Sequence, residues 1–181
     1  IERVFKPYLT NEYLDQMDDS ARIFDDLVFS TDTYVVNPLF FPGGNIGELA
    51  VCGTVNDLAV MGATPLFLSC GFIIEEGFEV QLLEKILTTM KDTCAKAGVK
   101  IVTGDTKVVE KGKCDGVFIN TSGIGQIHFS KPVTTQRIQP GDQFIINGDI
   151  ARHGICIVAA RGEFGLDVDL ETDSAALNLM L

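Results

Sequence analysis

Three aspartates could do chemistry, because each lies in or beside an apolar stretch where a solvated charge is unexpected. Asp32 interrupts a β-branched and aromatic run, Asp57 lies in a largely apolar segment, and Asp105 directly follows another apolar run. A buried carboxylate needs a cation, hydrogen-bond donors or a shifted pKa. Gathered at one end of a sheet, the three would bind divalent cations and let an acidic protein bind ATP. Taken singly, each is more often a turn former or a cap.

Other site chemistries find little support. The sequence has no Walker A lysine loop and no HExxH motif, and the glycine pair Gly123 and Gly125 lacks the third glycine of a dinucleotide fingerprint. With His128 and His153 as the two histidines, no serine or cysteine signature indicates a catalytic triad. The residues alone therefore support an α/β domain with a metal-nucleotide site.

Composition narrows the class of protein. The 181 residues, 46% of them hydrophobic, fit one globular domain with part of a second. A net charge of -11 argues against binding to nucleic acid or to an anionic membrane. No apolar run reaches ~18 residues and no signal peptide opens the chain, so we expect a cytoplasmic protein. Five widely spread cysteines without a CxxC pair indicate reduced core thiols: Cys52, Cys70, Cys94, Cys114 and Cys156.

The segment 40–63 is the centre of the expected fold, with a glycine turn followed by a helix over 46–63 that is apolar on nearly all sides and therefore buried. Apolar runs predict strands over 27–36, 66–74, 99–104 and 117–127. An amphipathic helix that Gly98 ends lies between the second and third of these strands. This strand, helix, strand unit predicts a crossover connection in the sheet.

The two ends of the chain are expected to be peripheral or to belong to a second unit. Residues 1–20 show helical spacing and predict one or two short helices. Residues 107–116 indicate an exposed excursion, 144–150 a strand, and 151–165 a helix. The acidic run after that helix predicts a loop before a new helix. Because the chain stops inside this helix-like run, we expect a piece of a longer protein.

Several motifs resemble the HypE family of hydrogenase maturation factors, the carbamoyl dehydratases. The resemblance covers about residues 25–167 and is carried by STDTYVVNPLFFPGGNIGELAVCGTVNDLAVMGATPLFLSCGFIIEEG, IVTGDTKVVEKG and FINTSGIG. NDLAVMGA is shared with the wider superfamily of aminoimidazole ribonucleotide synthetase, selenophosphate synthetase and thiamine-monophosphate kinase. FFPGGNIG, LSCGFIIEEG and TGDTKVV point to the dehydratases specifically.

The resemblance implies a fold and an activity. The fold is α/β, a mixed β-sheet flanked by helices in the PurM-like N-terminal domain, whose sheets pair into a barrel across a homodimer. The activity is ATP-dependent dehydration of a C-terminal cysteine thiocarboxamide to a thiocyanate, with ATP and Mg²⁺ as cofactors. The carbamoyl group comes from HypF, and the cyanide passes through HypC and HypD to the hydrogenase iron.

The resemblance also implies roles for particular residues. Metal ligands fall on Asp32, Asp57 and Asp105, with Asp25 a fourth, and the lysine used in the chemistry falls on Lys107. The remaining motif residues are expected to line the nucleotide or its phosphates: Gly43, Gly44, Asn56, Gly104 and Thr106. His153 lies where the family's second domain begins.

The chain departs from the family pattern in what it lacks. The family's N-terminal glycine-rich segment, most of its second domain with a catalytic glutamate, and its terminal cysteine are absent, so we expect this fragment to be inactive alone. The expected organisation is a helical segment over 1–24, the ATP-binding and dimerisation domain over 25–142, and the first strand and helix of a truncated domain over 143–181. A selenophosphate-synthetase-like or kinase-like enzyme, or a non-catalytic nucleotide-binding dimerisation module, remains the alternative.

Overall fold

A computed structural model describes residues 3–128, 133–165 and 168–180. Its centre is a five-stranded sheet in the order β1-β2-β7-β5-β6. The strands are β1 (Ala21–Ile23), β2 (Leu27–Tyr34), β5 (Ala63–Glu75), β6 (Lys100–Val109) and β7 (Val117–Ile127). β5 and β6 run parallel, while the other neighbours are antiparallel, so the expected mixed sheet is confirmed.

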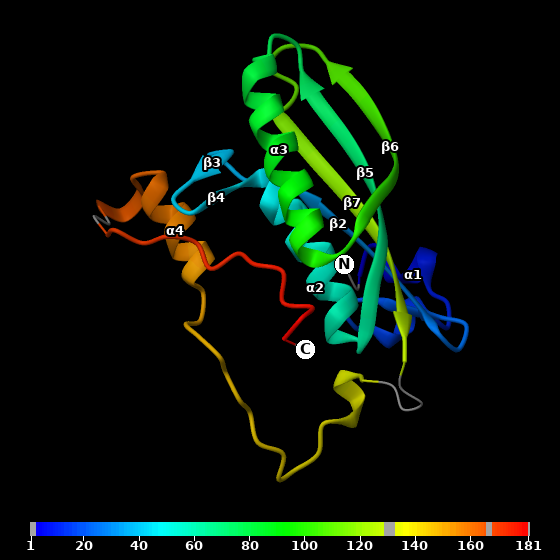
Figure 1. Cartoon of the computed structure of the whole chain (residues 1–181). Coiled ribbons are helices and arrows are strands. Elements are labelled where there is room, and N and C mark those ends of the chain that lie inside the picture. The colour runs from blue at the N-terminus through cyan, green and yellow to red at the C-terminus, as the bar shows by residue number, and fades with distance from the viewer. Residues whose placement is uncertain (1–2, 129–132, 166–167, 181) are drawn as a thin grey trace.

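Two helices, α2 (Ile46–Val60) and α3 (Val80–Ala97), cover one face of this sheet (Figure 1). α3 makes the crossover between the parallel strands β5 and β6, as the strand, helix, strand pattern predicts. Gly98 ends α3 in the left-handed conformation, with φ +72. The opposite face of the sheet has no helix over it in the part of the chain that the structure describes.

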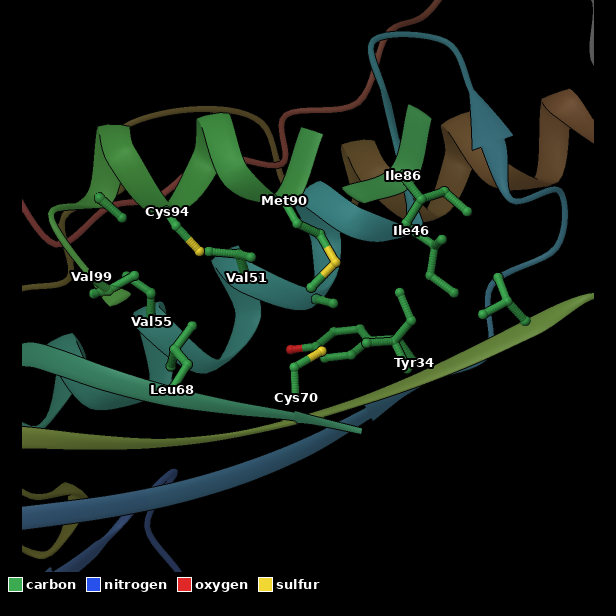
Figure 2. Packing of buried hydrophobic residues seen from close by; sticks show 14 residues of the cluster. Tyr34, Ile46, Val51, Val55, Leu68, Cys70, Ile86, Met90, Cys94 and Val99 are labelled. Atoms are coloured by element: carbon green, nitrogen blue, oxygen red, sulfur yellow. The ribbon is translucent and has the colours of Figure 1, made fainter. Parts of the chain in front are cut away.

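The core lies between the two helices and the sheet (Figure 2). Asn45 caps α2, since its side-chain oxygen accepts a hydrogen bond of 2.8 Å from the Gly47 amide. Gly47 also permits the close crossing of α3, because a Cβ there would lie 2.6 Å from the Ile86 carbonyl oxygen. Val51 and Val55 of α2 are fully buried against the sheet.

The chain after β7 leaves the sheet and returns to α2. β3 (Phe40–Phe41) and β4 (Gly44–Asn45) form a small hairpin before α2, and α4 (Arg152–Ala160) packs beside it. Residues 168–180, which we call the C-terminal strap, then run without regular structure along α2 (Figure 1). The strap has contacts from the hairpin, where Thr172 donates to Pro42, to the end of α3, where Asn178 donates to Ala97.

Three expectations about secondary structure are wrong. β6 continues to Val109, because β5 offers a parallel partner as far as Glu75, so Asp105 lies inside the strand instead of after it. Residues 144–150 form no strand; they find no pairing partner and their apolar side chains are exposed. The run from Ser174 is extended in the strap instead of helical, because the Leu177 amide donates to the Asn56 side chain of α2 and the Asn178 side chain donates to the Ala97 carbonyl of α3.

The N-terminal region has the expected short helices, α1 (Lys6–Leu9) and the 3₁₀ turn η1 (Leu14–Gln16). Two further 3₁₀ turns are η2 (Thr135–Arg137) and η3 (Glu163–Gly165). None of the helices in the described residues has the length and apolar character needed to cross a membrane.

Candidate functional site

A polar seam between β2 and α2 holds two of the three aspartates. Ser30, Asp32 and Tyr34 alternate along β2 and share the face that points to α2. Asp57, near the end of α2, accepts a 3.0 Å hydrogen bond from the Ser30 hydroxyl. Because Asp32 is the next residue on the same face of the strand, the two carboxylates are neighbours in the seam. Among the described residues β1 pairs with residues 27–29 only, so the edge of β2 at Asp32 is open there.

The electrostatics of the seam suit a cation. Burial raises the pKa of Asp57; the Ser30 hydrogen bond opposes this rise, and the charges of Asp32 and Asp19 add to it. Asp32 is held in place locally, since one of its carboxylate oxygens accepts a 2.8 Å bond from the Thr33 amide. Two half-buried carboxylates that repel one another, and offer only oxygen atoms, fit a hard divalent cation.

Tyr34 closes the inner end of the seam. Its side chain is buried among the core residues (Figure 2), and its hydroxyl has no hydrogen-bond partner among the residues that the structure describes. The hydroxyl lies against Gly53 of α2, where a Cβ would be 2.0 Å away. Gly53 precedes Asp57 by one helical turn, so the tyrosine hydroxyl and the Asp57 carboxylate lie along the same side of α2.

Asp105 and Lys107 form a second polar pair, on the other face of the sheet. Lys107 Nζ lies 2.8 Å from Asp105 Oδ2, and both side chains are largely exposed. The hydrogen bond from Lys107 lowers the pKa of Asp105, with the Thr106 amide acting in the same direction. A small cavity of about 200 Å³ at this pair is also lined by Gly71, Phe118 and Asn120.

The strand register shows how far this pair is from the seam. Asp32 pairs with Thr121, Thr121 with Cys70, and Cys70 with Gly104, the neighbour of Asp105. Three strand spacings separate the two ends of this row, which is about 14 Å. Asp105 also points away from the helices. Within one chain the three aspartates therefore do not converge, and no group of three metal-binding side chains occurs among the described residues.

Gly104 and Thr106 line a large cavity between α3 and β6. It measures about 1130 Å³, and Met90 and Cys94 of α3 and Cys70 of β5 contribute to its wall. Gly104 is needed for strand packing, because a Cβ there would lie 2.3 Å from the Cys70 carbonyl oxygen. Their role in nucleotide binding stays a prediction.

The other residues expected to line the nucleotide contact the C-terminal strap. Asn56 donates to the Ala175 carbonyl at 3.0 Å and accepts from the Leu177 amide at 2.8 Å. Gly43, with φ +84, and Gly44 form the hairpin turn, and a Cβ on either would meet Thr172 at 3.2–3.3 Å. Asn56 therefore holds the strap on α2, the two glycines leave room for Thr172 at the hairpin, and the role of all three toward a ligand stays a prediction.

His153 and Asp25 lie apart from the seam. His153 Nδ1 is 2.9 Å from the Thr172 hydroxyl, and its ring meets Phe41 edge-on with centroids 5.4 Å apart. Burial lowers the pKa of His153. Asp25 lies in the turn before β2, at the end of the strand opposite to Asp32, and its carbonyl accepts a bond from Arg22.

The sequence reasoning missed three residues of the seam: Ser30, Gly53 and Tyr34. A signal for two of them was available, because Ser30, Asp32 and Tyr34 follow the period of two that puts side chains on one face of a strand. Gly53 gave no local signal, since its reason is the close approach of a side chain from another element.

Comparison with known proteins places the chain in a family. A model of the family described as "AIR synthase related protein, N-terminal domain" matches residues 17–127. The chain belongs to this family. The seam, β6 and most of the sheet lie inside the matched range. The match bears out the expected superfamily and its PurM-like fold.

Closer relatives carry the name HypE. The chain is 53% identical, over 173 residues, to "Carbamoyl dehydratase HypE" of Rhodobacter capsulatus, covering 91% of this chain and 51% of that protein. A crystal structure of a HypE-HypF complex matches with a TM-score of 0.95 and 50% identity, covering 99% of this chain and 59% of the other. A structure of HypE in complex with ATP matches with a TM-score of 0.82 and 47% identity, covering 97% and 53%.

The chain spans about half the length of the curated relatives that it matches. The predicted resemblance to HypE is confirmed, and it extends over more of the chain than the quoted motifs cover. The activity of a whole protein is a separate matter, because the other half of the relatives has no counterpart in these residues.

Proposed function

We propose that this chain is the ATP-binding part of a HypE-type carbamoyl dehydratase, which converts a C-terminal cysteine thiocarboxamide to a thiocyanate for nickel-iron hydrogenase assembly in the cytoplasm. The observation that carries the proposal is the likeness over nearly the whole chain to a HypE whose structure holds ATP, at 47% identity. HypF as carbamoyl donor is supported by the HypE-HypF complex, at 50% identity. HypC and HypD as cyanide acceptors follow from the same assignment.

In this proposal the seam carboxylates Asp32 and Asp57 hold Mg²⁺, which offsets the charge of the triphosphate when ATP is bound. Ser30 sets the orientation of Asp57, and Asp32 lies at the open edge of β2. Lys107 is the cation available to stabilise negative charge, or to move a proton, at the amide that ATP activates. Its ion pair with Asp105 fixes the ammonium group at the sheet edge.

A homodimer would complete the site. The helix-free face of the sheet carries an apolar row of exposed side chains, Phe29, Ile124 and Phe67, which are register partners. The next two rows of register-paired side chains on this face are polar. Among the described residues, the free edges of the sheet are β6 and residues 30–34 of β2, which β1 does not reach. Closing two sheets into a barrel joins these edges, and sets Asp105 and Lys107 of one copy near Asp32 of the other.

The test uses the full-length protein with HypF, a carbamoyl donor and Mg-ATP. Mass spectrometry of the C-terminal peptide should show the carbamoylated cysteine and then the loss of one water. Lys107→Ala should accumulate the carbamoylated form, because the change removes the ammonium group and leaves the strand. A wild-type protein that keeps the carbamoyl group unchanged in the presence of Mg-ATP would overturn the assignment.

A further inference from the structure

The hydroxyl of Tyr34 is a buried polar group that the fold leaves without a partner. The residue is 7% exposed, and its hydroxyl neither donates nor accepts a hydrogen bond in the structure. Buried polar groups are nearly always satisfied, so an orphan needs a reason. A phenylalanine would fill the same space without the desolvation cost of the hydroxyl.

The fold nevertheless makes room for this oxygen. Gly53 lies above it on α2, and a Cβ at that position would be 2.0 Å from the hydroxyl. A glycine inside a helix costs about 1 kcal/mol relative to alanine. The unsatisfied hydroxyl of Tyr34 on β2 and the glycine inside α2 therefore each lower the stability of the fold. Together they let the hydroxyl reach the inner end of the seam.

Two polar side chains face the hydroxyl, Thr54 and Asp32, and neither comes within hydrogen-bonding geometry. Thr54 belongs to a closed network, because it lies 2.6 Å from the Thr121 hydroxyl, which itself donates to the Ala50 carbonyl. Thr54 and Thr121 are fully buried, so turning the Thr54 hydroxyl toward Tyr34 would break its bond to Thr121 where no solvent can replace it.

Asp32 has the freedom that Thr54 lacks. It is half-buried at the open edge of β2, and one of its carboxylate oxygens accepts a hydrogen bond from the Thr33 amide. The other oxygen can accept from the tyrosine after a side-chain rotation. A carboxylate that ligates a cation is commonly held by such an outer hydrogen bond.

We propose that Tyr34 is a positioning residue of the seam, whose hydroxyl donates a hydrogen bond to Asp32 when Asp32 holds a divalent cation. The inference rests on the proposed function, because it assigns Asp32 to the cation of Mg-ATP. Tyr34 itself touches neither metal nor nucleotide. It acts by fixing the orientation of the Asp32 carboxylate.

The experiment compares full-length wild type, Tyr34→Phe, Asp32→Asn and the matched control Thr54→Val. Two quantities are measured: the melting temperature without ligand, and the Mg²⁺ concentration that gives half-maximal binding of a non-hydrolysable ATP analogue. Tyr34→Phe should melt at the same or a higher temperature, since it removes an unsatisfied group, and should need about 10–100-fold more Mg²⁺. Thr54→Val should melt lower with an unchanged Mg²⁺ requirement, because it breaks the closed network only.

The outcomes separate this inference from the function on which it rests. If Tyr34→Phe melts lower and keeps the wild-type Mg²⁺ requirement, the hydroxyl is structural and the inference is wrong, while the proposed function stands. If wild type binds the analogue without Mg²⁺, or Asp32→Asn keeps the wild-type requirement, the metal site itself is misplaced and both fail.

Discussion

Replacing Asp57 by asparagine separates a metal ligand from a structural brace. The side chain keeps its shape, and the amide oxygen of asparagine can still accept the hydrogen bond that Ser30 donates at 3.0 Å. What disappears is one negative charge in a half-buried seam. If the aspartate serves a cation, its removal should cost ligand binding and little stability.

The expected change in stability follows from two opposing effects. Ser30 and Asp32 are two residues apart on β2, a rise of roughly 6–7 Å, and this rise sets the scale of the separation between the carboxylates because Asp57 is bonded to Ser30. Their repulsion at that separation is about 0.6 kcal/mol in bulk water and about 2.5 kcal/mol at an effective dielectric constant of 20. Because both are partly exposed, the lower half of that range applies. Losing the charge-assisted part of the Ser30 bond costs about 1 kcal/mol, so the two nearly cancel.

Thermal melts of full-length wild type and Asp57→Asn, with and without Mg-ATP, provide the assay. Without ligand the two melting temperatures should agree within about 2 °C, because 1 kcal/mol corresponds to about 2–4 °C for 150–250 residues and to less for the longer full-length protein. At a hundredfold excess over Kd, Mg-ATP should stabilise wild type by about 2.7 kcal/mol and the variant far less. A variant that loses more than about 2 kcal/mol without ligand, and still shows the wild-type shift, would refute the assignment of Asp57 as a ligand.

Four further predictions concern Gly53, Asn56, Glu75 and the dimer. Gly53→Ala should destabilise the fold by about 1–3 kcal/mol in chemical denaturation, and Tyr34→Phe should restore part of the loss by removing the clashing oxygen. Asn56→Ala should release the strap, seen as faster hydrogen exchange at its Leu177 amide, with the protection of the sheet unchanged. Glu75 accepts hydrogen bonds from the Gly112 and Gly116 amides, which lower its pKa. The protection of these two amides from hydrogen exchange should therefore persist to pH values below 4.5 and be lost on further acidification, whereas Glu75→Gln should show no such step. Light scattering should give a dimer mass, and a monomer at micromolar concentration would contradict the barrel.

The sequence predicted most of the sheet and both covering helices because their signals are local. The continuous apolar run of β5 and the amphipathic period of α3 are sufficient to assign each element. β6 was predicted too short, because TGDTKVV looks polar and exposed. What keeps it a strand is its pairing with β5, a non-local contact that no local pattern contains.

The candidate site was predicted in part for the same reason. Asp32 and Asp57 were identified from charges in apolar surroundings, and they are neighbours in the seam. Their distance from Asp105 depends on strand order, since β7 and β5 separate β2 from β6. Asn56 was assigned to the nucleotide from its motif, while the structure shows its amide bonded to the strap, which is remote in sequence.

The strap has a consequence for how the chain is made. Glu48, Cys52 and Asn56 lie one turn apart on α2, and the strap covers this outer stripe, with Ala176 packed against the core. The partner of Asn56 is 121 residues later in the sequence. At about 5–20 residues per second, a ribosome needs about 6–24 s to reach it. During that interval the nascent chain shows an uncovered helix, which is when a chaperone would bind it.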